Sequence, residues 1–142
     1  MSFVQKYNAL LARVEAAADD ALGREVAETV RDIMEEQTEY QVYSYEASPM
    51  AMASRRADCG GLGDRRNMAA AVLPGHELTV ENTAPFQSPA SGGSALSDVV
   101  EQGLSRYHQP GPRPFVAGTQ EEAVSSGRAY RALMRGLHRN GL

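Results

Sequence analysis

The sequence predicts an α+β fold built from a long N-terminal helix, a small antiparallel β-sheet, and a short helix and a C-terminal helix packed on the sheet. Three observations support this prediction. Apolar residues recur with helical spacing over the first 37 residues, strand-like segments are confined to the middle of the chain, and helical spacing returns after residue 119. A chain of 142 residues can bury a core without disulfides or metals, so we expect residues 1–142 to form a single domain.

The first element is a helix from Phe3 to about Gln37. Gly23 weakens this helix by roughly 1 kcal/mol relative to alanine, which permits a bend or a break there. Such a helix is long for so small a domain, so we expect it either to split in two or to project one end toward a neighbour. Its apolar residues repeat about every 3.6 positions and form one stripe that we expect to be buried. The stripe consists of Val4, Tyr7, Leu11, Val14, Ala18, Leu22, Val26, Val30 and Ile33.

Three segments in the middle of the chain are typical of strands. Residues 40–45 are rich in tyrosine and valine, which favour extended structure. Residues 67–73 form a second, alanine-rich candidate, and residues 77–82 alternate between apolar and polar side chains. Pro74-Gly75 is a turn signal between the last two segments, so we expect an antiparallel meander with a hairpin at this turn.

Two segments are predicted to be mobile loops, at about 46–66 and about 83–94. Both contain proline, glycine and serine and show little periodicity. Loops of this length in a small domain are usually functional or disordered. We therefore expect these two loops to reach neighbouring molecules.

A short helix around Leu96–Val100 is predicted to end at Gly103, and an unusually rigid segment follows it. Pro110, Pro112 and Pro114 each fix one backbone angle and bias the preceding residue toward an extended shape. Such a segment holds Phe115 in a defined place. We therefore predict that Phe115 fills the core.

The final helix is predicted to begin at Thr119, which has capping-box spacing to Glu122, and to stop near Gly141. One stripe of this helix is apolar and the opposite face carries four arginines, which complement the helix dipole where they lie near its C-terminus. The apolar stripe comprises Ala123, Val124, Gly127, Tyr130, Leu133, Met134 and Leu137, and the arginines are Arg128, Arg131, Arg135 and Arg139.

Charge is divided along the chain. Residues 1–46 carry four Lys or Arg against ten Asp or Glu, a net charge of −6. Residues 47–118 have six of each sign, and residues 119–142 have four Arg against two Glu, a net charge of +2. Complementary ends suit head-to-tail contact between copies. The alternative is that both are solvated helix faces.

The sequence contains no pattern typical of a catalytic, metal or cofactor site, so we do not expect an enzyme. His76, His108 and His138 lie about thirty residues apart and lack paired ligands at metal-binding spacing. Cys59 has no partner base nearby in sequence, although a small hydrolase that uses Cys59 and a distant histidine stays an alternative. The glycines of residues 60–63 lack the Lys-Ser/Thr of a phosphate loop and are better explained by turns or by close approach of another chain.

A single cysteine gives no disulfide framework, and no apolar run resembles a signal peptide or approaches the length of a membrane span. We therefore expect a protein that is made and assembled in the cytoplasm, away from the membrane.

Two arginine pairs, Arg55-Arg56 and Arg65-Arg66, lie in and at the end of the first loop. Four guanidinium groups on a flexible loop are able to contact DNA phosphates, which would make the protein a DNA-binding accessory protein. They are equally able to pair with carboxylates of the acidic long helix, in the same chain or in a neighbour. The acidic total charge favours pairing, and DNA binding stays the alternative.

Several short motifs carry a resemblance to a known family. Ser54-Arg55-Arg56, the glycines of residues 60–63 with Asp64 and Asn67, and residues 80–85 are similar to small virion proteins of long-tailed bacteriophages. The stronger elements are residues 99–103, with Glu101-Gln102-Gly103, and residues 112–115, with Pro114-Phe115. Together with the closing helix they resemble the ending of the neck or tail-completion (head–tail connector) family.

The resemblance implies a structural virion protein that forms a homo-oligomeric ring, six-fold symmetry being favoured, in the neck or at the end of the tail tube. Its implied partners are copies of itself and adjacent phage neck, portal-adaptor or tail-tube proteins. DNA would pass through the ring lumen without sequence-specific binding, and no membrane is involved. The resemblance also implies that Gly103, Pro114 and Phe115 are structural anchors. We expect the assembly interface to include Arg55, Arg56, Arg65, Arg66, Glu101, Arg106, Tyr107, His108 and Arg113.

Overall fold

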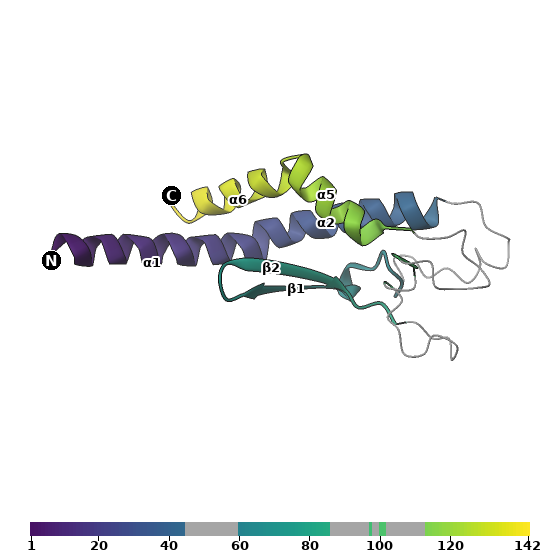
Figure 1. The fold of residues 1–142 in the computed structure, drawn as a ribbon, viewed down its shortest axis with the longest axis horizontal. Helices are drawn as coiled ribbons and strands as arrows, with labels where there is room; N and C mark the ends of the chain where they lie inside the picture. Colours follow the sequence, from purple (N-terminus) through teal and green to yellow (C-terminus); the bar gives the residue numbers. More distant parts are fainter. Residues whose placement is uncertain (45–59, 86–96, 98–99, 102–112) are drawn as a thin grey trace.

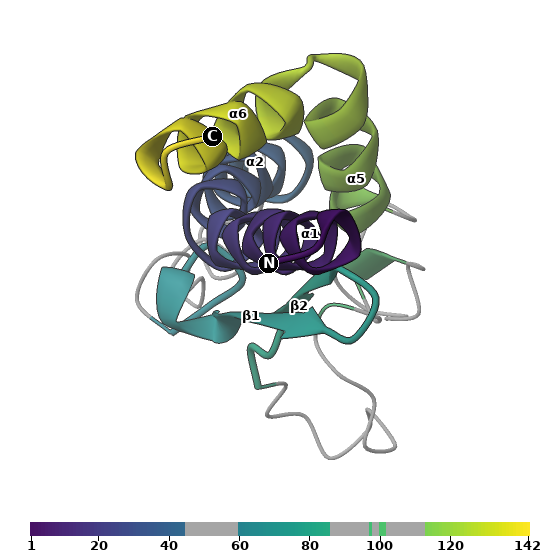
Figure 2. The same ribbon diagram turned by 90° about the vertical axis from the view of Figure 1, so that its left-hand side faces the viewer.

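The computed structural model describes residues 1–44, 60–85, 97, 100–101 and 113–142, and confirms the α+β class. One long helical rod formed by the N-terminal residues lies in the middle of the molecule (Figure 1). A β-hairpin lies along one side of this rod, and the two C-terminal helices lie along the opposite side (Figure 2). The N-terminal end of the rod extends beyond both of these layers.

The predicted long helix is present and is longer than expected. Ser2 begins it with a capping box, in which its hydroxyl accepts from the Gln5 amide while the Gln5 side chain accepts from the Ser2 amide. Gly23 does not break the rod but lies within a π-helical turn that leaves the helix continuous. Such a rod spans about 60 Å. In chain order it consists of α1 (Phe3–Ala21), a π-helical turn (Leu22–Val26), α2 (Ala27–Thr38) and a second π-helical turn (Glu39–Tyr43).

The strand predicted at residues 40–45 is wrong for the part described, because residues 40–43 continue the rod as helix. This helical turn buries Val42 in the core. It also lets the Gln41 side-chain amide donate to the Gln37 side chain at 2.6 Å and to the Pro114 carbonyl at 3.3 Å. These tertiary contacts outweigh the extended preference of tyrosine and valine, which is weak and depends on context.

The predicted hairpin is confirmed. Strands β1 (Met68–Leu73) and β2 (Glu77–Asn82) pair antiparallel, with Met68 opposite Asn82 and Leu73 opposite Glu77. The connection Pro74-Gly75-His76 has left-handed backbone at Gly75 (φ 87°) and at His76 (φ 61°). Among the described residues these two strands make up the whole sheet, so the predicted three-stranded meander is reduced to a hairpin.

The prediction of one final helix beginning at Thr119 is wrong. There are two helices, α5 (Phe115–Ser125) and α6 (Arg128–Arg139), separated by Gly127 in a left-handed conformation at φ 72°. Thr119 is buried within α5, and its hydroxyl donates to the Phe115 carbonyl at 2.7 Å instead of capping a helix. The fixed backbone angle of Pro114 before α5 and the backbone freedom of Gly127 before α6, rather than the capping-box spacing, therefore set the helix boundaries.

The break at Gly127 also changes which residues are buried. Val124 and Tyr130, predicted to lie on the apolar stripe, are 76% and 66% exposed. Ala132 and Gly136 of α6 are buried in their place, against α1. A helical period extrapolated across a left-handed glycine assigns the wrong face, because the second helix begins with a new orientation.

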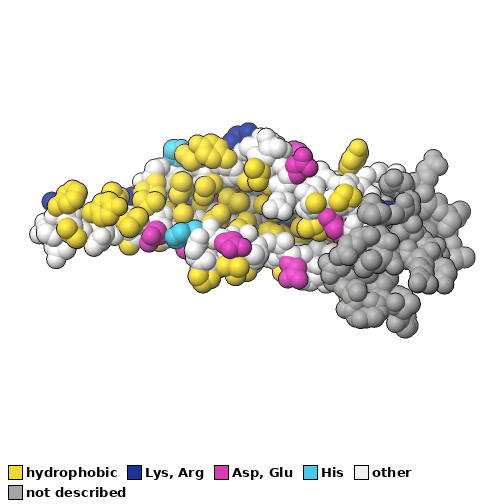
Figure 3. Space-filling view, viewed as in Figure 1, with side chains coloured by type: hydrophobic (Ala, Val, Ile, Leu, Met, Phe, Trp, Pro, Cys, Tyr) yellow, Lys and Arg dark blue, Asp and Glu magenta, His cyan; other side chains and the backbone are white. Residues whose placement is uncertain are grey.

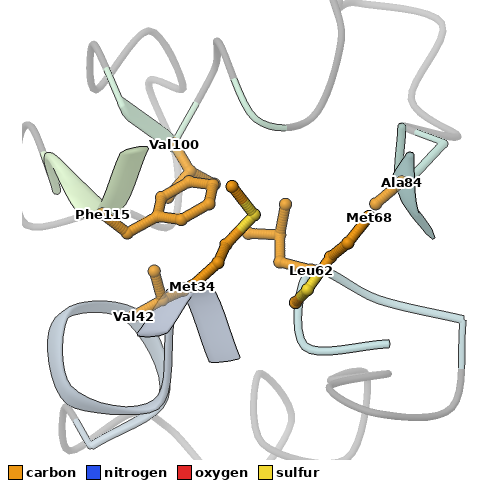
Figure 4. Packing of buried hydrophobic residues seen from close by; sticks show 7 residues of the cluster. All are labelled: Met34, Val42, Leu62, Met68, Ala84, Val100 and Phe115. Carbon is orange, nitrogen blue, oxygen red and sulfur yellow. The ribbon is translucent and has the colours of Figure 1, made fainter. Parts of the chain in front are cut away.

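The main core lies where α2, α5 and the residues flanking the hairpin meet. Phe115 is completely buried there, in agreement with the burial predicted for it. In Figure 4 the Met34 side chain extends between Phe115 on one side and Leu62 on the other. The cluster comprises Met34, Val42, Leu62, Met68, Ala84, Val100 and Phe115.

Several predicted features lie outside the described residues. These are the loop residues 46–59 and 86–94, the link between the short helix and the prolines, and Pro110 and Pro112. Of the predicted short helix, Ser97, Val100 and Glu101 are described, and all three are helical.

Candidate assembly surfaces

Arg65 joins the end of the first loop to the acidic face of α2. Its guanidinium contacts Glu28 at 2.6 Å, Asp32 at 2.6 Å and Glu35 at 3.1 Å. These carboxylates follow one another on one face of the helix, so a single planar cation reaches all three. The hydrogen bond from Arg65 holds the pKa of Glu28 below its usual value. Arg65 therefore pairs with carboxylates of its own chain, which is one of the alternatives that the sequence left open.

Arg66 pairs with Asp64, whose carboxylate organises the residues before the hairpin. The nearly buried Asp64 accepts from the Gly60 amide at 2.7 Å, from the Arg66 amide at 3.0 Å and from the Arg66 guanidinium at 2.6 Å. Chiefly because of the hydrogen bonds from Arg66, the pKa of Asp64 lies well below its ordinary value. Gly60 has φ +90°, so this glycine serves a turn, one of the two roles proposed for it.

Asn82 fixes this segment from the hairpin side. Its buried side-chain amide donates to the Leu62 carbonyl at 2.8 Å and its oxygen accepts from the Ala84 amide at 3.1 Å. Asn67 also binds the segment, donating from its side chain to the Gly61 carbonyl at 3.0 Å. Residues 60–67 are therefore a tightly bonded element, in contrast to the mobile loop predicted to extend to residue 66.

The basic C-terminal helix and the acidic N-terminal helix meet within the chain. Arg139 of α6 pairs with Asp20 and Glu25, and Arg128 donates to the Glu36 carboxylate from its two terminal guanidinium nitrogens, at 2.6 and 2.9 Å. Hydrogen bonds from Asn140 and Arg139 lower the pKa of the Asp20 carboxyl. These acidic and basic residues therefore pair within one chain, where they stabilise antiparallel packing of α6 on the rod.

Two further candidates, Glu101 and Arg113, make contacts that hold the fold together. The Glu101 carboxylate accepts from the backbone amides of Val116 at 2.9 Å and Ala117 at 3.0 Å, in the first turn of α5. The Arg113 guanidinium donates to the Val42 carbonyl at 3.2 Å, and its backbone amide donates to the Val100 carbonyl at 3.1 Å. Glu101 therefore binds the start of α5, and Arg113 connects the residues just before α5 to the end of the rod and to Val100.

The remaining candidates have different placements. Pro114 is exposed and occupies the N-cap position of α5, directly before the buried Phe115. The residues that lie outside the described part of the chain are Arg55, Arg56, Cys59, Gly103, Arg106, Tyr107 and His108.

The most prominent surface is one that helical periodicity predicts to be buried. Residues 3–14 of α1, which we call the projecting helix, are exposed on all sides. The rings of Phe3 and Tyr7 stack on this helix, with 6.5 Å between their centroids. Figure 3 shows hydrophobic side chains along this end and onward over the body of the molecule. The exposed apolar residues are Phe3 (82%), Val4 (62%), Tyr7 (56%), Leu10 (55%), Leu11 (43%) and Val14 (38%).

This apolar stripe continues directly into a buried helix–helix contact. One and two turns beyond Val14 the same face of the rod carries Ala17 and Ala21, which are 5% and 0% exposed beneath α6. Arg13 marks the boundary, donating to the Gly141 carbonyl at 3.0 Å. The stripe therefore continues the face of α1 that packs against α6, and it lies beyond the end of α6.

Among the described residues, no group of three or more histidine, cysteine, aspartate or glutamate side chains is arranged to hold a metal ion. Within the same part of the chain, no helix has both the length and the apolar character needed to cross a membrane.

Neither a curated protein nor a solved structure matches the chain. A family model, that of YomN, matches residues 6–139, from the projecting helix through α5 to the end of α6. This family is derived from a Bacillus phage, which makes the protein phage-related. Because the match spans nearly the whole chain, the protein belongs to the YomN family.

Proposed function

We propose that the protein is a structural virion component that forms a ring in the phage neck or at the end of the tail tube and joins head to tail. The observation that carries this proposal is the apolar stripe on the projecting helix. The phage-derived family and the resemblance of residues 99–103 and 112–115 to neck and tail-completion proteins support the same role.

The energetics of the projecting helix favour assembly. Burying one large apolar side chain contributes about 1.5–3 kcal/mol, and six such side chains are exposed along residues 3–14. Residues 3–14 continue a longer helix and so carry no separate nucleation cost, but little tertiary packing stabilises them, because all of them are exposed. Contact with another molecule would remove the apolar surface from water and stabilise the helix at once.

The proposed ring joins copies of this chain, with six-fold symmetry favoured, and contacts adjacent neck, portal-adaptor or tail-tube proteins. DNA would pass through its lumen without sequence-specific contacts. The alternative of a DNA-binding accessory protein is weakened by the pairing of Arg65 with three carboxylates and of Arg66 with Asp64. Phosphates would have to compete with these carboxylates for both guanidinium groups.

The test is whether the protein assembles and enters virions. Mass spectrometry of purified phage particles should detect it, and native mass spectrometry of the purified protein, alone and with the products of neighbouring genes, should detect a ring. Leu11→Glu should abolish the ring because it places a charge in the apolar stripe. Ala9→Glu is the matched control: it adds the same charge on the opposite face of the same helix and should leave assembly intact.

Circular dichroism should show that both variants remain folded. A protein that stays strictly monomeric and is absent from virions would disprove the proposed function. Equal loss of assembly in Leu11→Glu and Ala9→Glu would remove the argument from the apolar stripe.

A further inference from the structure

We propose that the projecting helix of one copy docks on the outer face of α5 of a second copy. This inference rests on the proposed self-association and names the surface that receives the projecting helix. It requires a second apolar surface on the same chain, a complementary charge and a geometry that permits repetition. The described residues provide all three.

The apolar surface is the outer face of α5. Val116 and Val124 are 37% and 76% exposed and lie two helical turns apart, with the exposed Gln120 between them. Tyr130, in the first turn of α6, is 66% exposed. The two valines leave an apolar face of α5 that nothing else in the described part of the chain covers, and Tyr130 is a further exposed apolar side chain at the start of α6.

Charge complementarity selects this face over a second projecting helix. The first 14 residues contain Lys6 and Arg13 and no acid, and helical geometry places these two cations along one edge of the apolar stripe. The α5 helix contains no cation, and helical geometry places Glu121 at the edge of the face that carries Val116, Gln120 and Val124. Docking on α5 therefore brings opposite charges to the rim of the contact, whereas pairing two projecting helices would bring four cations together.

The proposed contact joins two different surfaces, so it is heterologous. Within one chain the projecting helix points away from α5, as Figure 1 shows, so its stripe is free to meet another copy. Repetition of a heterologous contact closes a ring if the rotation per subunit permits, and otherwise gives a filament. The inference therefore supplies a contact of the kind that the proposed ring needs.

Site-specific crosslinking tests the contact. Cys59→Ser removes the one native thiol. In that background, Asn8→Cys lies at the edge of the stripe and Gln120→Cys lies between the two exposed valines, so neither removes an apolar side chain. When the two single-cysteine proteins are mixed and treated with a short bismaleimide, we expect a crosslinked dimer that contains one copy of each. Ala9→Cys, on the opposite face of the projecting helix, should yield about tenfold less of it.

A charge-reversal cycle gives a second readout that does not depend on crosslinking. Lys6→Glu and Glu121→Lys should each weaken association about two- to fivefold, the range expected for a rim ion pair. The double variant should recover affinity close to that of the unmodified protein. Failure of the double variant to recover would overturn the α5 assignment.

The remaining outcomes also decide between the proposals. Dominant crosslinking between two Asn8→Cys chains would show that projecting helices pair with each other and would overturn this inference, while leaving a role in virions standing. An intact oligomer without any crosslink between residues 8 and 120 would overturn it as well. A crosslink between these residues in a protein that is absent from virions would support the contact and disprove the proposed function.

Discussion

Gly136 of α6 lies so close to Ala21 of α1 that no side chain fits between the two helices. A Cβ placed on Gly136 would lie 2.3 Å from the Ala21 Cβ and 2.9 Å from its Cα. Ala21 is fully buried, and so is Ala132, one turn before Gly136 in α6. The C-terminal helix is therefore held on the rod by small residues at the centre of the contact, with ion pairs from Arg139 at its edge.

We expect Gly136→Ala to destabilise the fold by about 1–3 kcal/mol, because the added methyl group meets backbone that cannot move without separating the helices. Urea unfolding followed by circular dichroism measures this. Gly118→Ala is the matched control, since its Cβ would meet the flexible ends of Gln37 and Gln41, at 2.5 Å each, which are able to rotate away. If Gly136→Ala instead raised stability by the roughly 1 kcal/mol that alanine gains over glycine in a helix, the close contact would be disproved.

Phe115→Ala should cost about 3–5 kcal/mol, because it removes a completely buried ring from the centre of the core and leaves a cavity. Chemical unfolding of the purified protein tests this expectation. Val116→Ala, at the partly exposed neighbouring position, should cost much less. A Phe115→Ala protein with unchanged stability that no longer assembles would place Phe115 in the assembly interface.

Glu101→Ala should destabilise α5 by about 0.5–2 kcal/mol, the usual effect of losing a helix cap. The residue at the N-cap position is Pro114, which has no side chain able to cap, so Glu101 supplies the acceptor for two amides of the first turn. Thermal unfolding compares this variant with Glu77→Ala, which removes an exposed carboxylate of the hairpin. Equal melting temperatures in the two variants would contradict a capping role.

The pair His76–Asp19 should make stability depend on pH. The hydrogen bond that His76 donates to the Asp19 carboxylate, at 2.7 Å, and the charges of Asp19 and Glu15 raise the pKa of His76 above its ordinary value of 6.5. Below about pH 6.5 the imidazole is protonated in both the folded and the unfolded state, so its attraction to Asp19 contributes fully to folding stability. This stabilisation is lost as the pH rises through the raised pKa of His76 in the folded state.

The melting temperature should therefore fall more between about pH 5.5 and about pH 8.5 in the unmodified protein than in His76→Asn. Asparagine tolerates the left-handed backbone at this position, so the variant tests charge and not backbone strain. An identical pH dependence in both proteins would show that the pair makes no contribution.

The exposure of the apolar stripe on the projecting helix was only partly predictable from the sequence. The apolar spacing of Val4, Tyr7, Leu11 and Val14 is plain in the sequence, yet periodicity records only that a face is apolar, not what covers it. The sequence allowed for a projecting end, and only the short length of α6 shows which end projects. The sequence does not show the intrachain partners of Arg65 and Glu101, because these partners lie 30 or more residues away for Arg65 and 15 or more for Glu101.

By itself the sequence determined the α+β class, the long helix and the hairpin, because these follow from local patterns: helical apolar spacing, alternation along residues 77–82, and Pro74-Gly75 at the turn. Tertiary structure decided the rest. It kept residues 40–43 helical through contacts to the core, divided the last helix at Gly127, and turned α6 so that Gly136 meets Ala21. These outcomes depend on distant residues that pack together, and such contacts leave no local signal in the chain.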